Sequence, residues 1–252
     1  NATLSGTINL QRDSQIGVNS GTGTITGAIA GPFSLTKIRG ALLVNSGNNT
    51  YTGITTVNDG QLRFGSAGAI GNSPTVIVEN PANPGSSDTN ALQLSGGITL
   101  GSGRTLILRN NSTSNIPNAR TAFENSSGNN TWLGSIVLDR GVNQTLTSTS
   151  GILTIAGNIS QSANPSTSMF IRGNSNGVIT GNINLGSGQI AKTDGGAWTI
   201  SSTGNVHGTV ALANGNLIVN ATNALNPAST LVLGEGNGNN GRLTINAGFT
   251  QS

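Results

Sequence analysis

A five-residue unit of the form apolar-x-Gly-x-apolar recurs along the whole chain, and it constrains the fold more than any other feature of the sequence. Residues 4–8 and 155–159 are two clear copies. The central glycines of the unit are Gly6, Gly27, Gly53, Gly96, Gly134, Gly157, Gly181 and Gly208. When the two longest gaps are each counted as two units, the period is about 22 residues. A fixed period of this size is typical of solenoid proteins, in which each repeat stacks on its neighbours.

Short strands separated by turns fill each period. Leu106-Ile107-Leu108 and Leu153-Thr154-Ile155 have the length and residue types of strands, and Gly and Asn lie between such runs. No segment has the sustained 3.6-residue period of a helix. About 22 residues are enough for three short strands and three turns, whereas a propeller blade needs about 40. The sequence therefore predicts an all-β chain folded as a parallel β-helix (β-solenoid) of roughly eleven coils. The crossover rule for parallel strands predicts that it is right-handed.

Longer stretches repeat as well, and the clearest copies span residues 35–78, 121–141 and 190–233. A shift of 155 residues aligns Lys37 with Lys192 and keeps this register through the first copy without a gap. The same shift pairs Gly53 with Gly208, Gly60 with Gly215 and Leu62 with Leu217. Seven units of about 22 residues account for the shift. We therefore expect residues 1–252 to form a single solenoid segment that is part of a longer chain.

The composition excludes several classes of protein. Only 8% of the residues are charged and 38 of the 252 are glycine, which is unfavourable for helices. The eleven Lys and Arg residues are scattered singly, so we expect no nucleic-acid partner. No apolar run is long enough to span a membrane. Because the chain has no Cys and His207 is its only histidine, we expect neither a metal site nor another cofactor.

The acidic residues argue against catalysis. They are spread along the chain without a close pair, at Asp13, Asp59, Glu79, Asp88, Glu124, Asp139, Asp194 and Glu235. Polysaccharide lyases and hydrolases that use a β-helix need clustered carboxylates for calcium or for acid–base chemistry. The sequence therefore predicts that the protein is not an enzyme. A carbohydrate-active enzyme of the lyase or hydrolase type is the alternative.

Two kinds of feature are candidates for ligand binding. Tyr51 and Trp132 occupy equivalent repeat positions, where an aromatic ring can pack against neighbouring coils or stack on a sugar. Three polar segments interrupt the period, at residues 79–90, 110–120 and 161–168. Such segments on a rigid scaffold commonly carry binding, but they are also where insertions without a role are tolerated. The sequence does not decide between core packing and sugar stacking for the two rings, or between binding and no role for the three segments.

One copy of the repeat carries a specific motif. Its residues are Gly47, Asn48, Asn49, Thr50, Tyr51, Gly53, Gly60 and Leu62, and more degenerate copies continue it at Gly134, Gly208, Gly215 and Leu217. Residues 46–62 closely resemble the passenger-associated transport repeat, or autotransporter-associated β-strand repeat, of bacterial autotransporter passenger domains. This resemblance implies a right-handed β-helix that is secreted by a Gram-negative-type bacterium and displayed at the cell surface or released.

These observations together predict a non-enzymatic structural or adhesive segment of an extracellular or surface-displayed bacterial protein. An open β-helix leaves strand edges at both ends, and such edges pair with other strands unless they are covered. We therefore expect the coil to continue in a longer chain, or to stack end to end with other copies into a rod or fibre. Surface glycans and the surface of a host or neighbouring cell are the other candidate partners.

Overall fold

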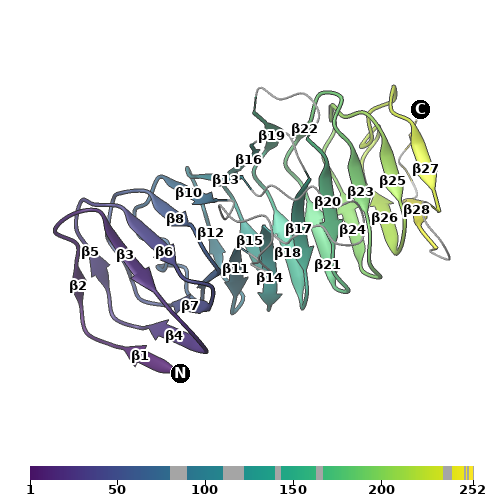
Figure 1. Ribbon diagram of the computed structural model, residues 1–252. Coiled ribbons are helices and arrows are strands. Elements are labelled where there is room, and N and C mark those ends of the chain that lie inside the picture. Colours follow the sequence, from purple (N-terminus) through teal and green to yellow (C-terminus); the bar gives the residue numbers. More distant parts are fainter. Residues whose placement is uncertain are drawn as a thin grey trace.

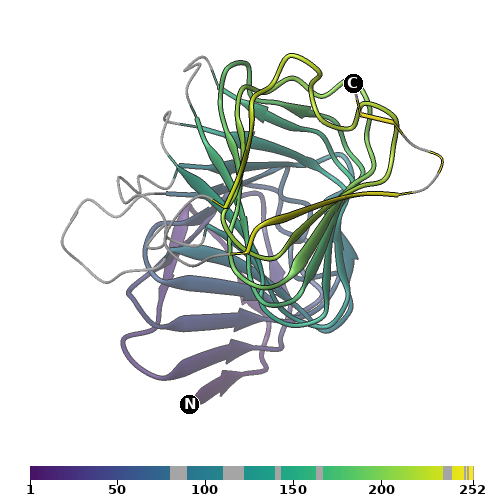
Figure 2. The same cartoon turned by 90° about the vertical axis from the view of Figure 1, so that its right-hand side faces the viewer.

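The structure is a computed structural model that describes residues 1–79, 90–109, 122–139, 143–162, 167–234, 240–246, 248 and 250–251. These residues form strands and turns, and none of them is helical. Figure 1 shows the strands coiling about one long axis, with the two termini at opposite ends of the rod. Figure 2, turned to face the C-terminal end, shows the successive coils stacked behind one another. The chain is therefore an all-β solenoid, as the sequence predicts.

The longest sheet, here called the long sheet, has 11 strands, and they are parallel. Its strands are β1 (Ala2–Leu4), β4 (Thr22–Ile25), β7 (Leu42–Asn45), β9 (Gln61–Phe64), β11 (Ala91–Ser95), β14 (Phe123–Ser127), β17 (Gln144–Ser148), β20 (Met169–Arg172), β23 (Ile190–Lys192), β25 (Val210–Leu212) and β27 (Leu231–Leu233). This sheet runs the length of the rod (Figure 1).

The eight-stranded sheet and the third face complete the coils. The eight-stranded sheet consists of β3 (Ser14–Gly17), β6 (Leu35–Ile38), β8 (Thr55–Val57), β10 (Thr75–Val78), β13 (Thr105–Leu108), β16 (Ser135–Leu138), β19 (Ile159–Gln161) and β22 (Ile183–Asn184). The third face consists of the pair β2 (Ile8–Asn9) and β5 (Ile29–Ala30), and of the seven-stranded sheet β12 (Thr99–Leu100), β15 (Asn130–Trp132), β18 (Ile152–Ile155), β21 (Asn176–Ile179), β24 (Ala197–Ile200), β26 (Asn216–Val219) and β28 (Arg242–Ile245).

The coil repeats about every 23 residues and makes about nine turns, so the predicted period of about 22 is close and the predicted eleven coils are slightly too many. The long sheet has 11 strands, but the eight-stranded sheet stops at β22 because the last coils add no strand to it. Some middle coils are also longer than the average. Thr75 and Thr105, which are register partners, are 30 residues apart.

The two best-matched sequence copies lie on different faces of the coil. Lys37 is in β6 of the eight-stranded sheet, whereas Lys192 is in β23 of the long sheet. The strand after each lysine differs in the same way, because β7 lies in the long sheet and β24 lies in the seven-stranded sheet. The separation of 155 residues is therefore not a whole number of turns, and its interpretation as seven units is wrong. The physical reason is that the longer middle coils use more residues per turn.

The core is one continuous column of inward-facing side chains. Along β10, Val76 and Val78 are buried, while Thr75 and Ile77 alternate with them and are half-buried. A single hydrophobic cluster extends in this way from Leu10 to Leu225. Burial of such side chains contributes roughly 1.5–3 kcal/mol each. No helix in the described part of the chain is long and apolar enough to cross a membrane.

Candidate functional site

The motif residue Asn49 links three successive coils from a buried position. Its Oδ1 accepts a hydrogen bond from the backbone N–H of Ile29 at 2.7 Å, on the preceding coil. Its Nδ2 donates to Oδ1 of Asn45 at 3.1 Å and to the carbonyl of Ala69, on the following coil, at 2.7 Å. The side chain is only 5% exposed, so these bonds are shielded from water. Asn49 therefore holds the corner of the coil together.

Two further asparagines repeat this arrangement. Oδ1 of Asn130 accepts from the N–H of Ile98, and Oδ1 of Asn205 accepts from the N–H of Ile183, both at 2.7 Å. Nδ2 of Asn205 also donates to the carbonyl of Ala224, which is the sequence partner of Ala69. The asparagine-rich composition thus has a structural role in the corners of at least three coils.

Replacing Asn49 with Ala is expected to lower the free energy of unfolding by about 2 kcal/mol, because the buried N–H of Ile29 and the carbonyl of Ala69 lose their partner. The neighbouring motif residue Asn48 is exposed, so Asn48→Ala should change stability by less than about 0.5 kcal/mol. Urea denaturation of the two variants measures the difference. Equal effects would show that the buried corner bonds do not stabilise the coil.

The repeat glycines mark places where the backbones of adjacent coils meet. A Cβ atom on Gly47 would lie 2.0 Å from the carbonyl oxygen of Gly27, and one on Gly134 would lie 2.3 Å from that of Arg104. Gly53 and Gly208 meet backbone atoms of the preceding coil just as closely. The other motif residues lie as the strand pattern requires, with Leu62 and Leu217 in the core and Thr50 exposed. The glycines of the motif thus mark close contacts between adjacent coils, and its leucines lie in the core.

The two aromatic candidates for sugar stacking are buried completely. Tyr51 and Trp132 each have an exposed fraction of 0%. The Tyr51 hydroxyl hydrogen-bonds with Oγ1 of Thr55 at 2.7 Å, and burial raises the pKa of Tyr51 to about 12. The Trp132 ring packs edge-on against Phe123 with ring centroids 5.7 Å apart. Neither ring presents a face to a ligand, so we interpret both as core residues and no longer as candidates for stacking on a sugar.

His207 is the third member of the set formed by Tyr51 and Trp132. It lies two residues after the corner residue Asn205, as they do after their own corner asparagines, and it is 1% exposed. Its Nε2 accepts a hydrogen bond from the backbone N–H of Asn226 at 3.0 Å. The ungapped alignment instead places His207 opposite Thr52. It misses the equivalence because the later copy has one residue fewer between its asparagine and its glycine.

His207 should make the protein less stable in mild acid. Burial lowers the pKa of His207 below its ordinary value of 6.5, so as the pH falls below about 7 the unfolded chain takes up more of a proton than the folded chain does. The free energy of unfolding should therefore fall as the pH falls through this range. His207→Gln should flatten the profile, because no other side chain ordinarily titrates there. Urea midpoints at several pH values test this, and an unchanged slope in the variant would contradict it.

The first of the two lysines, Lys37, points into the coil and not into water. Its Nζ donates to the backbone carbonyl oxygens of Ile38 at 3.1 Å, of Arg39, and of Asp59 on the next coil at 2.7 Å. Arg39 has φ 71°, a left-handed conformation that is uncommon without glycine. Burial lowers the pKa of Lys37 to about 8, and the nearby Asp59 opposes this shift.

The second lysine, Lys192, repeats this carbonyl cage. Its Nζ donates to the backbone carbonyl oxygens of Thr193, of Asp194 at 2.7 Å, and of Asn214 on the next coil at 3.2 Å. Asp194 has φ 60° and corresponds to Arg39 of the first copy. Burial lowers the pKa of Lys192 to about 8. The sequence aligns the two lysines, but only the structure shows that each one links two coils.

The polar segments of residues 79–90, 110–120 and 161–168 all connect the eight-stranded sheet to the long sheet, at one corner of the rod. Residues 80–89, 110–121, 140–142 and 163–166 lie outside the described residues. The strands that end there are adjacent in the eight-stranded sheet: β10, β13, β16 and β19. The strands that begin there are adjacent in the long sheet: β11, β14, β17 and β20. We call this edge the insertion corner.

A charged ladder lines the described side of the insertion corner. Arg109, just after β13, forms ion pairs with Glu79 at 2.7 Å and with Asp139 at 2.9 Å, on the coils before and after it. The three side chains are 20–29% exposed. Hydrogen bonds to both carboxylates raise the pKa of Arg109. The ladder therefore ties three coils together at the point where the insertions leave.

The sequence reasoning missed this ladder, although a signal for it exists. Each member follows a buried strand of the same type, in Val76-Ile77-Val78-Glu79, Leu106-Ile107-Leu108-Arg109 and Ile136-Val137-Leu138-Asp139. Successive members are 30 residues apart, not 22, because the insertions lengthen these coils. Within the described ranges, no group of three or more His, Asp or Glu side chains is placed to hold a metal ion.

Neither a protein-family model nor a curated protein matches the chain. No solved structure matches it either. The geometry of the coil, its corners and its ends is therefore what bears on function.

Proposed function

We propose that the chain is a non-enzymatic structural and adhesive segment of a secreted or surface-displayed bacterial protein. The observation that carries the proposal is the insertion corner, where the four connections from β10, β13, β16 and β19 of the eight-stranded sheet to the long sheet are all longer than the connection between β8 and β9, beside one continuous core. A rigid scaffold that groups variable segments along one edge is a common arrangement for binding. The core below them, with its buried asparagines and lysines, supplies stiffness and not chemistry.

The resemblance of residues 46–62 to the passenger-associated transport repeat supports the location. On that basis, the protein is placed outside a Gram-negative-type bacterium, at its surface or released from it. The partners that fit such a position are surface glycans and the surface of a host or neighbouring cell. The few charged residues outside the ladder favour an uncharged or weakly charged partner over nucleic acid.

A carbohydrate-active enzyme is the rival function, and Glu79 and Asp139 are its best candidates. They are the acids that one residue, Arg109, brings together. Both carboxylates are engaged by that guanidinium, however, and a general acid–base pair needs one carboxyl group free to exchange a proton with the substrate. The ladder therefore favours a structural role for these acids.

Incubating the protein with a panel of immobilised bacterial and host polysaccharides, with and without calcium, tests the proposal. We expect retention on one or more polysaccharides with no release of reducing or unsaturated sugar products. Product formation that is abolished by Glu79→Gln or Asp139→Asn would overturn the proposal and establish the enzyme. Absence of retention on the polysaccharides and on fixed cells alike would overturn the adhesive role.

A further inference from the structure

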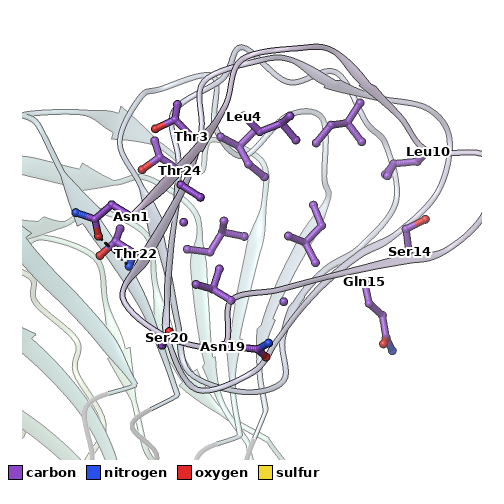
Figure 3. Close-up of a pocket in the computed structure, with 18 of the residues that line it drawn as sticks. Asn1, Thr3, Leu4, Leu10, Ser14, Gln15, Asn19, Ser20, Thr22 and Thr24 are labelled. Carbon is purple, nitrogen blue, oxygen red and sulfur yellow. Dashed lines mark hydrogen bonds between the residues drawn. The ribbon is translucent and has the colours of Figure 1, made fainter.

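The outer face of the eight-stranded sheet changes character beside the insertion corner. Alternate residues of each strand point into the coil or away from it, as Figure 3 shows on β3, where Ser14 points inward and Gln15 points outward. In the outward row that contains Gln15, the register partners on β6 and β8 are Thr36 and Thr56. On β10, β13 and β16, which border the insertion corner, the same row carries Ile77, Ile107 and Val137. We call these three residues the aliphatic strip.

Core packing does not account for the aliphatic strip, because its side chains point away from the core. On β10 the inward-facing Val76 and Val78 are fully buried, whereas Ile77 between them is half-buried. Strand propensity does not account for it either, because threonine is also β-branched and serves the same row at Thr36 and Thr56. An apolar line therefore replaces a polar one on the surface of these three coils.

Polar groups border the aliphatic strip on both sides. Two positions before it, register partners on the same strands are Thr75, Thr105 and Ser135. Within the described part of the chain, the hydroxyl groups of these three residues make no hydrogen bond to another group. Two positions after the strip is the ladder of Glu79, Arg109 and Asp139, whose side chains are 20–29% exposed. The surface thus has an apolar centre, with hydroxyl groups along one margin and ion-paired groups along the other.

The size and charge of this surface decide which kind of partner it fits. Three strands about 4.8 Å apart, each with five residues of about 3.3 Å, cover roughly 240 Å². A specific protein interface needs about 800 Å² on each partner, so the surface is too small for a folded protein. The ladder has two carboxylates and one guanidinium, so its excess negative charge repels acidic polysaccharides. Uncharged sugars fit, because a pyranose ring has an apolar face of C–H groups and hydroxyl groups around its edge.

We infer that the aliphatic strip and its polar margins bind an extended, uncharged polysaccharide chain that runs along the rod. The C–H faces of successive sugars pack on the strip, and their hydroxyl groups hydrogen-bond with Thr75, Thr105 and Ser135 on one side and with the ladder on the other. An apolar lining with a few polar groups that fix orientation is typical of ligand sites. The inference rests on the proposed function and names its ligand class. A surface of this size binds weakly by itself, so it supplements recognition at the insertion corner and does not replace it.

Retention of the full chain on immobilised glucan and mannan, with polygalacturonate as the acidic counterpart, tests the inference. The wild type should be retained by an uncharged matrix and not by polygalacturonate. The double variant Ile77→Thr/Ile107→Thr, which places in both positions the residue type of Thr36 and Thr56, should bind about tenfold more weakly. Its melting temperature should be unchanged, because both side chains lie outside the core.

Val137→Thr and Val178→Thr form a matched pair that decides the question if the double variant is unstable. Each exchanges a methyl group for a hydroxyl group at an outward, half-buried position, and Val178 lies on the seven-stranded sheet. Only Val137→Thr should weaken retention.

Three results would overturn the inference: undiminished retention of the double variant, equal effects of the two valine variants, and retention by polygalacturonate that equals or exceeds that by the uncharged matrices. In each of these cases the wild type still binds, so the adhesive function stands. A wild type that no matrix and no fixed cell retains would overturn the proposed function itself.

Discussion

Replacing Gly157 with Ala is expected to lower the free energy of unfolding by about 4 kcal/mol, because among the described glycines it is the one at which an added Cβ atom would come closest to a neighbouring atom. A Cβ atom on Gly157 would lie 1.7 Å from the carbonyl oxygen of Gly134 and 2.3 Å from its carbonyl carbon. Both atoms belong to the backbone of the preceding coil, so no side chain can rotate away. The coils must separate at this corner, which weakens the sheet hydrogen bonds on either side.

Gly6 provides the matched control. It occupies the same place in the repeat, but no atom lies within 4 Å of the position that a Cβ atom would take there, and its backbone needs no positive φ. Gly6→Ala should therefore change stability by less than about 0.5 kcal/mol. Urea denaturation followed by circular dichroism compares the two variants. A loss in Gly157→Ala no larger than in Gly6→Ala would show that the repeat glycine does not mark close contact between coils.

Replacing Lys192 with Met is expected to lower the free energy of unfolding at pH 7 by about 3 kcal/mol. The variant fills the same space but leaves the buried carbonyl oxygen of Thr193 and the half-buried ones of Asp194 and Asn214 without the donor that Nζ provides. Arg63→Met is the control on the outer side of the long sheet, where the side chain is half-buried, and it should cost less than about 1 kcal/mol. Equal losses would contradict a structural role for the lysine cage.

The same lysines should make the protein more stable in mild alkali. The folded pKa of Lys37 and of Lys192 is about 8, against an ordinary 10.5, so between about pH 8 and 10 the unfolded chain binds more protons than the folded chain. The free energy of unfolding then rises with pH. Above about pH 11 the trend reverses, because the unfolded lysines have by then lost most of their protons, whereas Tyr51, which is ionised in the unfolded chain, keeps a pKa of about 12 when folded. A flat profile between pH 8 and 10 would contradict these lowered pKa values.

The fold was predictable because its main constraint, the regular spacing of the repeat glycines, is visible in the sequence. Glycine recurs where the backbones of adjacent coils approach most closely, as at Gly47 and Gly134, so the spacing of these glycines is close to the period of the coil. The face on which a given repeat lies was not predictable in the same way. The coils between Lys37 and Lys192 differ in length, so the two lysines lie in different sheets. The sequence around each lysine does not show how many turns of the coil separate them.

The candidate site was predictable only in outline. The polar segments stand out because they interrupt the period, but their convergence on one corner depends on which strands they connect. The ladder of Glu79, Arg109 and Asp139 joins residues whose separation of 30 differs from the average period. The alignment by 155 residues gives His207 the wrong repeat position for a similar reason. It aligns Gly208 with Gly53, but one residue is missing before Gly208, so Asn205 no longer aligns with Asn49.

The most direct test of the scaffold account is surface binding by a protein whose insertion corner has been trimmed. Residues 80–89 and 110–121 are each replaced by Asp-Gly, which also occurs in the short connection between β8 and β9 at Asp59 and Gly60. The buried Asn90 is kept, because its side chain hydrogen-bonds Gly60, Asn58 and Glu79. We expect the melting temperature to be preserved while retention on polysaccharides and fixed cells is lost. Undiminished retention by a folded, trimmed protein would contradict the claim that this corner carries recognition.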